Sequence, residues 1–312
     1  MAVGDIIDRD DYNSIQTIVQ NVLGTGSSNS GYGQPVLSSP VSTGQRVTIQ
    51  EWDNVRNDII NIYRHQNGTI PTLPSATEGA KVRYNTTNSV WNKFLTEVQG
   101  LNTDRFDLGV MQFLTTNQGS APNFTSLWKN ALTCIVTVEF DSGEEARYFF
   151  NSGGKIEFTS SRSGGTESGG SSTIRAQNAN WTALLDSASP ALFGGSTSLT
   201  LNGSNYFGCT SSYTSPFFSA TGTSAYSTND WTIYARTPGV ANNNSGSAST
   251  IEFRVEWNDD HVPRGRATVD GVNGTLTLSS RSIDPIFNLV PASAVPNPIS
   301  VPTTTFSNIT GN

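Results

Sequence analysis

Apolar residues follow helical spacing near the N-terminus and alternate with polar residues farther along the chain. In the first segment they recur every three or four residues, which predicts an amphipathic helix that ends at about Leu23. Either Asp8 or Asp10 is suited to cap its start. The apolar stripe of this helix consists of Tyr12, Ile15, Ile18, Val19 and Val22.

A second helix is predicted by the capping box Thr48 to Glu51, whose hydroxyl and carboxylate satisfy free N–H groups at a helix start. The helix ends at an Asn-Gly pair that begins at Asn67. A third helix is expected over about 90–99, with Asn88 as its cap. The apolar face of the second helix consists of Trp52, Val55, Ile59, Ile62 and Tyr63.

The segment Thr133–Ser161 predicts a meander of three strands. β-Branched and aromatic residues mark the strands, and Asp, Asn, Ser and Gly mark the two tight turns between them. The expected strands are Ile135–Phe140, Arg147–Phe150 and Lys155–Thr159, and the turns are Asp141–Gly143 and Asn151–Gly154.

Strand patterns resume in the second half of the chain. Thr250–Trp257 alternates between apolar and charged residues, as in an antiparallel strand with one wet face. A short helix is expected around Trp181, and the other expected strands are Thr197–Leu201, Trp231–Arg236 and Gly274–Ser280. The chain is therefore expected to be mainly β with N-terminal helices, forming an antiparallel, jelly-roll-like β-sandwich.

Composition divides the chain into four parts. Residues 1–70 are expected to form a helical anchor with a linker rich in Gly, Ser and Pro, and 71–128 a connecting region with one short helix. The β-sandwich would occupy 129–284. Residues 285–312 contain several prolines, so we expect an extended arm that pairs at a sheet edge or lies on a partner.

Two short amphipathic helices joined by a long loop must bury their apolar stripes against other apolar side chains, of the same chain or of a neighbour. A neighbouring subunit is one candidate, and we predict an interface formed by Tyr12, Ile15 and Val19 of the first helix and by Trp52, Val55, Ile59 and Tyr63 of the second. The alternative is an intramolecular helix pair, and the sequence leaves both open.

Composition excludes several classes of function. Only 14% of the residues are charged and the net charge is −7, which argues against a phosphate-binding surface for nucleic acid. No apolar run is long enough to span a bilayer, and the acidic N-terminus does not resemble a secretory signal. We therefore expect a soluble protein that is made in a cytosol and contacts neither nucleic acid nor membrane.

The residues for catalysis or metal binding are scarce. The chain has two histidines and two cysteines, and it lacks the HExxH, GxSxG and phosphate-loop motifs. His65 is expected to be a cation near the negative end of a helix dipole. Cys134 is expected to be a core residue, and a bridge to Cys209 is disfavoured in a reducing compartment. We expect no catalytic residues, no metal and no cofactor.

Two constellations are candidates for binding sites. Asp259 and Asp260, with Glu256, could bind a cation, although a polar turn explains the same pattern. Aromatic residues in the strands could line a carbohydrate site, although strand aromatics also fill cores. The residues of this second candidate are Trp231, Tyr234 and Trp257.

Five segments, in order along residues 31–158, resemble a family of virion structural proteins of tailed bacteriophages, common in phages of cyanobacteria. Beyond residue 163 the similarity is one of character only. The matching segments are Gly31–Val36 (GYGQPV), Val47–Ile59 (VTIQEWDNVRNDI), His65–Gly68 (HQNG), Arg105–Gly109 (RFDLG) and Arg147–Ile156 (RYFFNSGGKI).

The resemblance implies assembly rather than catalysis, in the neck, tail or fibre of a virion. The expected partners are other virion proteins and further copies of this chain. Two alternatives come from other classes of function. One is a receptor- or glycan-binding fibre module, and the other is a polysaccharide hydrolase that would use Glu256 and Asp259.

Overall fold

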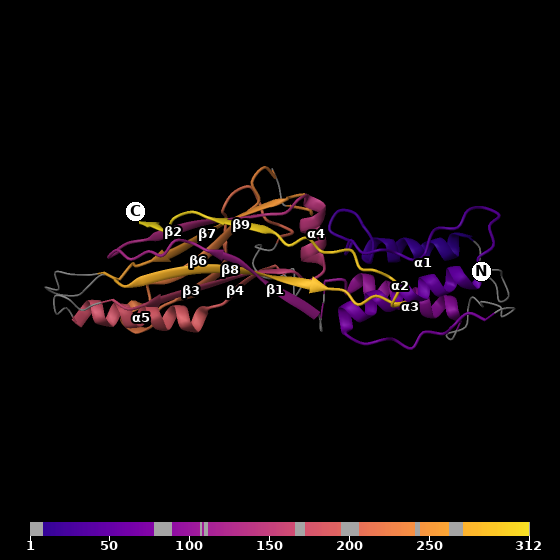
Figure 1. The fold of residues 1–312 in the computed structure, drawn as a ribbon, viewed down its shortest axis with the longest axis horizontal. Coiled ribbons are helices and arrows are strands. Elements are labelled where there is room, and N and C mark those ends of the chain that lie inside the picture. Colours follow the sequence, from indigo (N-terminus) through magenta and orange to yellow (C-terminus); the bar gives the residue numbers. More distant parts are fainter. Residues whose placement is uncertain are drawn as a thin grey trace.

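The computed structural model is elongated, with a helical body at one end and a β body at the other (Figure 1). A single helix lies between the two bodies, and the C-terminal segment runs along both of them. The structure describes residues 9–77, 89–106, 108, 112–165, 172–194, 206–240, 244–261 and 271–311.

The helical body contains α1 (Arg9–Val22), α2 (Ile49–Asn67) and α3 (Val90–Thr103). Helices lie at the first two predicted positions, and the N–H of Thr48 donates to the Glu51 carboxylate at 2.7 Å. Of the two caps proposed for the first helix, Asp10 lies within α1, and Asp8 lies outside the described residues. The third helix is longer than predicted, and Ser89 caps it by accepting the Asn92 N–H at 3.2 Å. The predicted cap, Asn88, lies outside the described residues.

The linker between α1 and α2 is fixed to the helices by buried polar groups. The Asp58 carboxylate accepts the N–H groups of Leu37 and Ser38 at 2.9 and 2.8 Å. The Asn13 side chain bonds both the N–H and the carbonyl of Val41. Burial raises the pKa of Asp58 to about 6, because desolvation of the charged form outweighs these hydrogen bonds.

The described strands form two sheets, and every pair is antiparallel. The four-stranded sheet has the order β1 (Gln112–Ser120), β8 (Thr275–Ile286), β3 (Lys155–Ser163) and β4 (Ala191–Gly194). The six-stranded sheet has the order β10 (Thr310–Gly311), β2 (Leu132–Glu139), β7 (Thr250–Asn258), β6 (Asp230–Arg236) and β5 (Pro216–Thr221), and β9 (Thr303–Phe306) pairs with β2.

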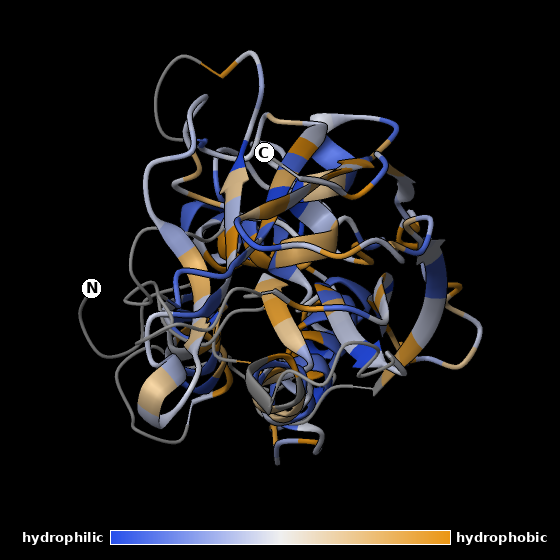
Figure 2. Ribbon diagram, turned by 90° about the vertical axis from the view of Figure 1, so that its left-hand side faces the viewer, coloured by the Kyte–Doolittle hydropathy of each residue, from blue (hydrophilic) through white to orange (hydrophobic). Residues whose placement is uncertain are grey.

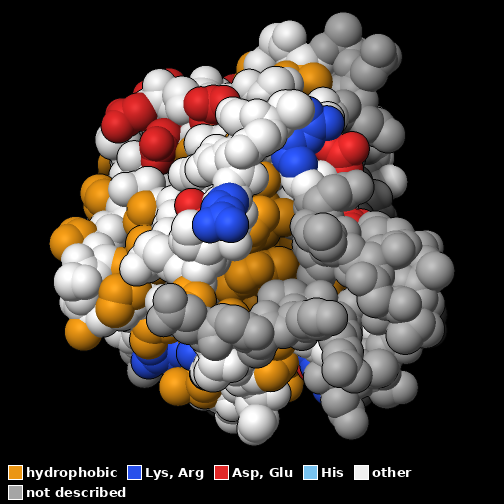
Figure 3. All heavy atoms as spheres, turned by 90° about the vertical axis from the view of Figure 1, so that its right-hand side faces the viewer, with side chains coloured by type: hydrophobic (Ala, Val, Ile, Leu, Met, Phe, Trp, Pro, Cys, Tyr) orange, Lys and Arg blue, Asp and Glu red, His pale blue; other side chains and the backbone are white. Residues whose placement is uncertain are grey.

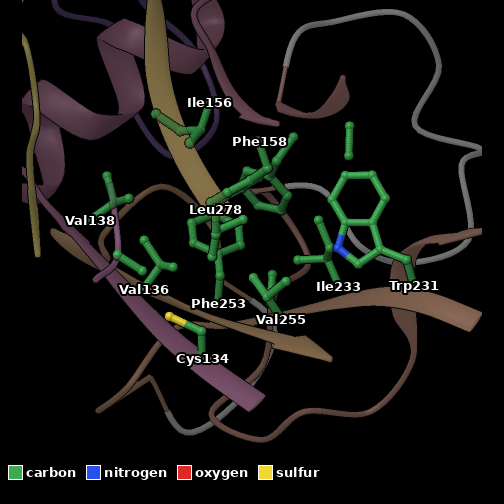
Figure 4. Close-up of a cluster of buried hydrophobic side chains, with 14 of the residues drawn as sticks. Cys134, Val136, Val138, Ile156, Phe158, Trp231, Ile233, Phe253, Val255 and Leu278 are labelled. Carbon is green, nitrogen blue, oxygen red and sulfur yellow. The ribbon is translucent and has the colours of Figure 1, made fainter. Parts of the chain in front are cut away.

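The two sheets share one apolar core. Apolar and polar residues alternate along the strands (Figure 2), and the apolar side chains of both sheets point toward one another (Figure 4). The Phe253 ring of β7 lies 4.8 Å from the rings of both Phe158 and Phe193, which belong to the opposite sheet. The alternation predicted for Thr250–Trp257 is confirmed, since every second residue of β7 is buried. The helix around Trp181 is also present, as α5 (Ser172–Ala188).

The predicted meander is wrong at its centre, because Arg147–Phe150 belongs to a helix, α4 (Gly143–Asn151). Ser142, assigned to a turn, caps this helix by accepting the Glu145 N–H at 3.1 Å. Both Phe149 and Phe150 are buried, as adjacent positions of a helix allow and alternation along a strand with one wet face does not. The flanking strands β2 and β3 therefore belong to different sheets. The strand predicted at Thr197–Leu201 lies outside the described residues.

The predicted limits of the sandwich are too narrow on both sides. β1 lies in the segment assigned to the connecting region, yet it pairs with β8 from Gln112 to Ser120, with one register shift between Asn117 and Gly119. The C-terminal arm begins only after β8 ends at Ile286, and its short strands β9 and β10 pair with the edge of β2. The arm thus pairs at a sheet edge, and that edge belongs to its own chain.

Replacement of Phe253 by alanine is expected to destabilise the fold by about 3–5 kcal/mol, because a buried ring leaves a cavity between the sheets. The matched control is Val295→Ala, since Val295 is 78% exposed and its change should stay within about 0.5 kcal/mol. Chemical denaturation measures both, and equal losses would contradict the placement of Phe253 at the centre of the core.

Candidate functional site

The predicted interface residues are already buried within the chain. Five of them are fully buried and Trp52 is nearly so, while Tyr63 is half-buried. Trp52 packs edge-on against Tyr12 with ring centroids 5.5 Å apart, and it lies 5.8 Å from Phe94 of α3. The interface prediction is therefore corrected for the six buried residues, because a third helix completes their burial, and it stays a prediction for Tyr63. The fully buried residues are Tyr12, Ile15, Val19, Val55 and Ile59.

Apolar side chains also reach the surface at the helical end of the molecule, while acidic ones gather along the upper rim of that view (Figure 3). Ile49 and Ile70, at the two ends of α2, are 36% and 61% exposed. Neither belongs to the stripe from which the interface was predicted. The stripe residues face the interior of the helical body.

The three aromatic residues predicted to bind a ligand do not form a patch. Trp231 and Trp257 are fully buried between the sheets, and the Trp257 indole N–H donates to the Ser160 hydroxyl at 3.0 Å. Tyr234 alone is half-buried, on the outer face of the six-stranded sheet. The prediction is corrected for the two tryptophans, because their positions alternate with those of the wet face.

Tyr234 belongs to a cluster of aromatic and charged side chains on that outer face. Tyr213, in the loop before β5, lies 4.7 Å from the guanidinium carbons of both Arg236 and Arg254. Arg236 is paired with Glu252 at 2.5 Å, and Arg254 is paired with Glu256 at 2.9 Å. The Tyr213 hydroxyl also donates to Glu252. Both arginines are thus neutralised within the cluster.

Sequence reasoning missed Tyr213, because a tyrosine in a polar loop gives no periodic signal. Its packing between two arginines and its hydrogen bond to a carboxylate depend on contacts from β6 and β7. Burial and the neighbouring carboxylate raise the pKa of Tyr213, so its hydroxyl stays protonated and donates. The loop is thereby fixed to the sheet.

The candidate cation-binding carboxylates are held apart by different partners. Asp259 is buried and accepts the Gln177 side-chain amide of α5 at 3.0 and 3.2 Å. Asp260 is exposed, and Glu256 is paired with Arg254. Within the described part of the chain, no three His, Cys, Asp or Glu side chains gather as a metal ion would need. Asp259 instead connects α5 to the end of β7.

The place where the helical body and the β body meet is built largely from four of the five segments that carry the resemblance to virion proteins. Tyr32 is buried there, and its hydroxyl donates to the Arg105 carbonyl at 2.7 Å. The same hydroxyl accepts the Gln66 side-chain amide at 2.8 Å. We call this region the junction, and it consists of Tyr32, Gly33, His65, Gln66, Arg105, Tyr148, Asn151, Ser152 and Phe287.

His65 connects three segments at the junction. Its ring stacks on Phe287 with centroids 3.8 Å apart and lies 5.1 Å from the Tyr32 ring. Its Nε2 is 3.1 Å from the carbonyl of Ser152, at the end of α4. Burial lowers the pKa of His65 to about 4, so the ring is neutral and Nε2–H donates to that carbonyl. The expectation of a cationic His65 is therefore wrong, since burial outweighs the helix dipole.

The α4 side of the junction bonds the linker directly. The Asn151 side-chain amide donates to the Gly31 carbonyl at 2.9 Å, and Arg147 donates to the Thr25 carbonyl at 3.0 Å. Gly33 has a φ of +68°, and a Cβ placed there would lie 2.5 Å from the Tyr148 ring. The close approach of linker and helix therefore requires glycine at this position.

The C-terminal strap, residues 287–302, crosses the same region. The Asn61 side chain of α2 bonds both the N–H and the carbonyl of Val290, at 2.6 and 3.1 Å. The Asn297 side-chain amide donates to the Gly33 carbonyl at 2.7 Å, and Gln34 donates to the Asn297 carbonyl at 3.1 Å. Strap, linker, α2 and α4 therefore constrain one another.

Comparison with known proteins adds no assignment. No protein-family model, curated protein sequence or solved structure matches the chain significantly. Among the described residues, no helix is both long and apolar enough to cross a bilayer.

Both cysteines are free and buried, and burial raises the pKa of Cys209 to about 12.

Gly33→Ala is expected to destabilise the protein by more than about 2 kcal/mol, because the new Cβ clashes with Tyr148 and the positive φ adds strain. The matched control is Gly44→Ala, whose φ of +80° imposes a similar strain with nothing within 4 Å. The free energies of unfolding of the two variants, measured with denaturant, separate the clash with Tyr148 from the strain of a positive φ. Equal losses would contradict tight packing at the junction.

His65 is expected to make the protein less stable as the pH falls from about 6.5 to about 4. The folded ring stays neutral down to about 4 while the unfolded one is protonated near 6.5, so acid favours the unfolded state. Relative to His65→Gln, which keeps an N–H donor for Ser152, the wild type should lose about 3 kcal/mol across this window.

Asp58 gives the free energy of unfolding the opposite dependence on pH and serves as an internal control. Its folded pKa is raised to about 6, so the folded state takes up the proton first and gains stability as the pH falls from about 6 to about 4. The two contributions oppose each other in the wild type, so each must be measured as a difference from Asp58→Asn or His65→Gln. Denaturation curves at several pH values give both slopes, and equal slopes for wild type and His65→Gln would refute a buried neutral His65.

Proposed function

We propose that this chain is a structural and assembly protein of a tailed-phage virion, in the neck (collar), tail or fibre. It acts through protein–protein interfaces and performs no catalysis. Its partners are other virion proteins and further copies of itself, and it resides in the virion after synthesis in the host cytoplasm. The proposal includes no cofactor, no nucleic acid and no membrane.

The observation that carries the proposal is the convergence of four of the five motif segments on the junction, to which Val47–Ile59 does not contribute. Gly31–Val36 supplies Tyr32 and Gly33, and His65–Gly68 supplies His65 and Gln66. Arg105 and the end of α4 supply the remaining hydrogen-bonding partners. Segments more than 70 residues apart in the sequence thus build one feature, which supports a resemblance that is more than compositional.

A firm junction suits a component that holds other proteins in place. The linker, α2, α4 and the C-terminal strap all bond across it, so a force on one body is transmitted to the other. An enzyme that needs domain closure would instead have few contacts at such a hinge. The elongated shape adds surface at both ends of the molecule (Figure 1).

The jelly-roll-like description of the β body belongs to this proposal. The chain passes between the sheets from β1 to β2, from β2 to β3, from β4 to β5, from β7 to β8 and from β8 to β9. Such repeated crossing supports a jelly-roll-like sandwich rather than two independent meanders.

The two alternatives receive less support. A glycan-binding module would have to rely on Tyr234 and Tyr213, because both tryptophans are buried. A hydrolase would need Glu256 and Asp259 in one cleft, yet they are bonded to Arg254 and to Gln177 respectively. Neither alternative explains why four of the motif segments meet at the junction.

The proposal is tested on virus particles. An antibody raised against the purified chain should label particles of the virus that encodes it in electron micrographs, at one defined position. The chain should also co-purify with the particles in a fixed ratio to the major capsid protein. Labelling confined to the soluble fraction of infected cells would overturn the proposal.

A further inference from the structure

Within the described part of the chain, the first half of β1 is a sheet edge without a covering strand. β1 pairs with β8 on one side, and no described strand pairs with its other side. Phe113 is 55% exposed and Leu114 is 62% exposed, although adjacent strand residues point to opposite faces. Ile286, at the end of β8, is 39% exposed. Apolar side chains are therefore accessible on both faces of this edge.

The other edge strands are short or interrupted. Among the described strands, β4 has four residues, β9 has four and β10 has two. β5 begins at Pro216 and has a register shift next to it. Proline, bulges and short length are the usual devices that prevent pairing at an edge. β1 has nine residues, and its one register shift lies between Asn117 and Gly119, so Gln112–Asn117 pairs with β8 without a break.

β1 also lacks the charges that commonly protect an edge. Its sequence, QFLTTNQGS, contains no Lys, Arg, Asp, Glu or Pro. Its second half is partly covered, because Thr304 of β9 bonds Gln118 at 3.2 Å. The accessible segment is thus Phe113–Asn117, and its central residue is Thr115.

We infer that Phe113–Asn117 of β1 pairs with the same segment of a second copy of this chain, antiparallel and about a two-fold axis at Thr115. Leu114 then lies opposite Thr116, and Phe113 lies opposite Asn117. Every cross-strand pair is uncharged. The two Phe113 side chains flank the axis on one face of the strand pair, and the two Leu114 side chains flank it on the other. The two four-stranded sheets become one continuous sheet across the interface.

The proposed function includes contacts between copies of this chain, and the first half of β1 is suited to such a contact because it is uncharged. The chain has a net charge of −7, so two copies repel one another wherever acidic surfaces meet. An uncharged strand permits self-pairing without like charges in opposite positions. The inference rests on the proposed assembly function and names the surface through which copies associate.

Cross-linking tests the register directly. Thr115→Cys introduces the only exposed thiol, because Cys134 and Cys209 are both buried. Residues on the two-fold axis of an antiparallel pair lie within about 4.5–5.5 Å, which is disulfide range. Mild oxidation should give a dimer band on non-reducing gels. Thr159→Cys, on the exposed face of β3, is the matched control and should stay monomeric.

Light scattering tests the association itself. The wild type should have at least twice the chain mass of 33.4 kDa, and Leu114→Lys should return it to the monomer. Leu192→Lys adds the same charge at a 46% exposed position on β4 and should leave the mass unchanged. Circular dichroism verifies that both variants are folded.

Two outcomes overturn the inference. A monomeric wild type refutes self-pairing. The contact also lies elsewhere if the Leu114→Lys variant remains an oligomer and the Thr115→Cys variant forms no disulfide-linked dimer. Binding of an unrelated protein to β1 in place of a second copy would likewise refute it. In each case particle labelling still decides the proposed virion function separately.

Discussion

The structure depends on the burial of one neutral histidine ring between the two bodies. His65 stacks on Phe287 and donates to the Ser152 carbonyl, so it contacts α2, the C-terminal strap and the end of α4. A charged ring would lose its hydration there without a described carboxylate near enough to pair with it. The neutral state of His65 therefore sets the conditions under which the helical body and the β body remain joined.

The surrounding contacts follow from that constraint. Tyr32 lies beside His65, and its hydroxyl donates to the Arg105 carbonyl and accepts the Gln66 side-chain amide. Gly33 lets the linker approach Tyr148 closely enough for Asn151 to reach Gly31. Because the linker and the strap both cross this point, loss of one contact affects the others. The junction is a network, and its energies should not be additive.

Local patterns in the sequence were sufficient to predict the positions of the first two helices and of β7. The stripe of α2 and its capping box depend only on residues within the helix, and the alternation of β7 depends only on its two faces. The aromatic run in α4 has no clear period, and the Ser142 cap decides its conformation. This is why Arg147–Phe150 was predicted as a strand.

The functional residues were harder to predict than the fold. Whether an amphipathic stripe contacts its own chain or a neighbour depends on what else packs there, and α3 supplied the answer here. Trp231 and Trp257 illustrate the same limit, because an aromatic residue in a strand fits either face. The motif segments were identified in the sequence, but the meeting of four of them at the junction follows from tertiary contacts that no local pattern contains.

Hydrogen exchange measured by mass spectrometry tests most directly whether the junction makes the two bodies one structural unit. Under native conditions, peptides from α2 and from β7 should open with the same free energy, because the bodies unfold together. His65→Ala should lower both values equally. If α2 opens at a much lower free energy than β7, the bodies are independent, and the account of a firm junction is contradicted.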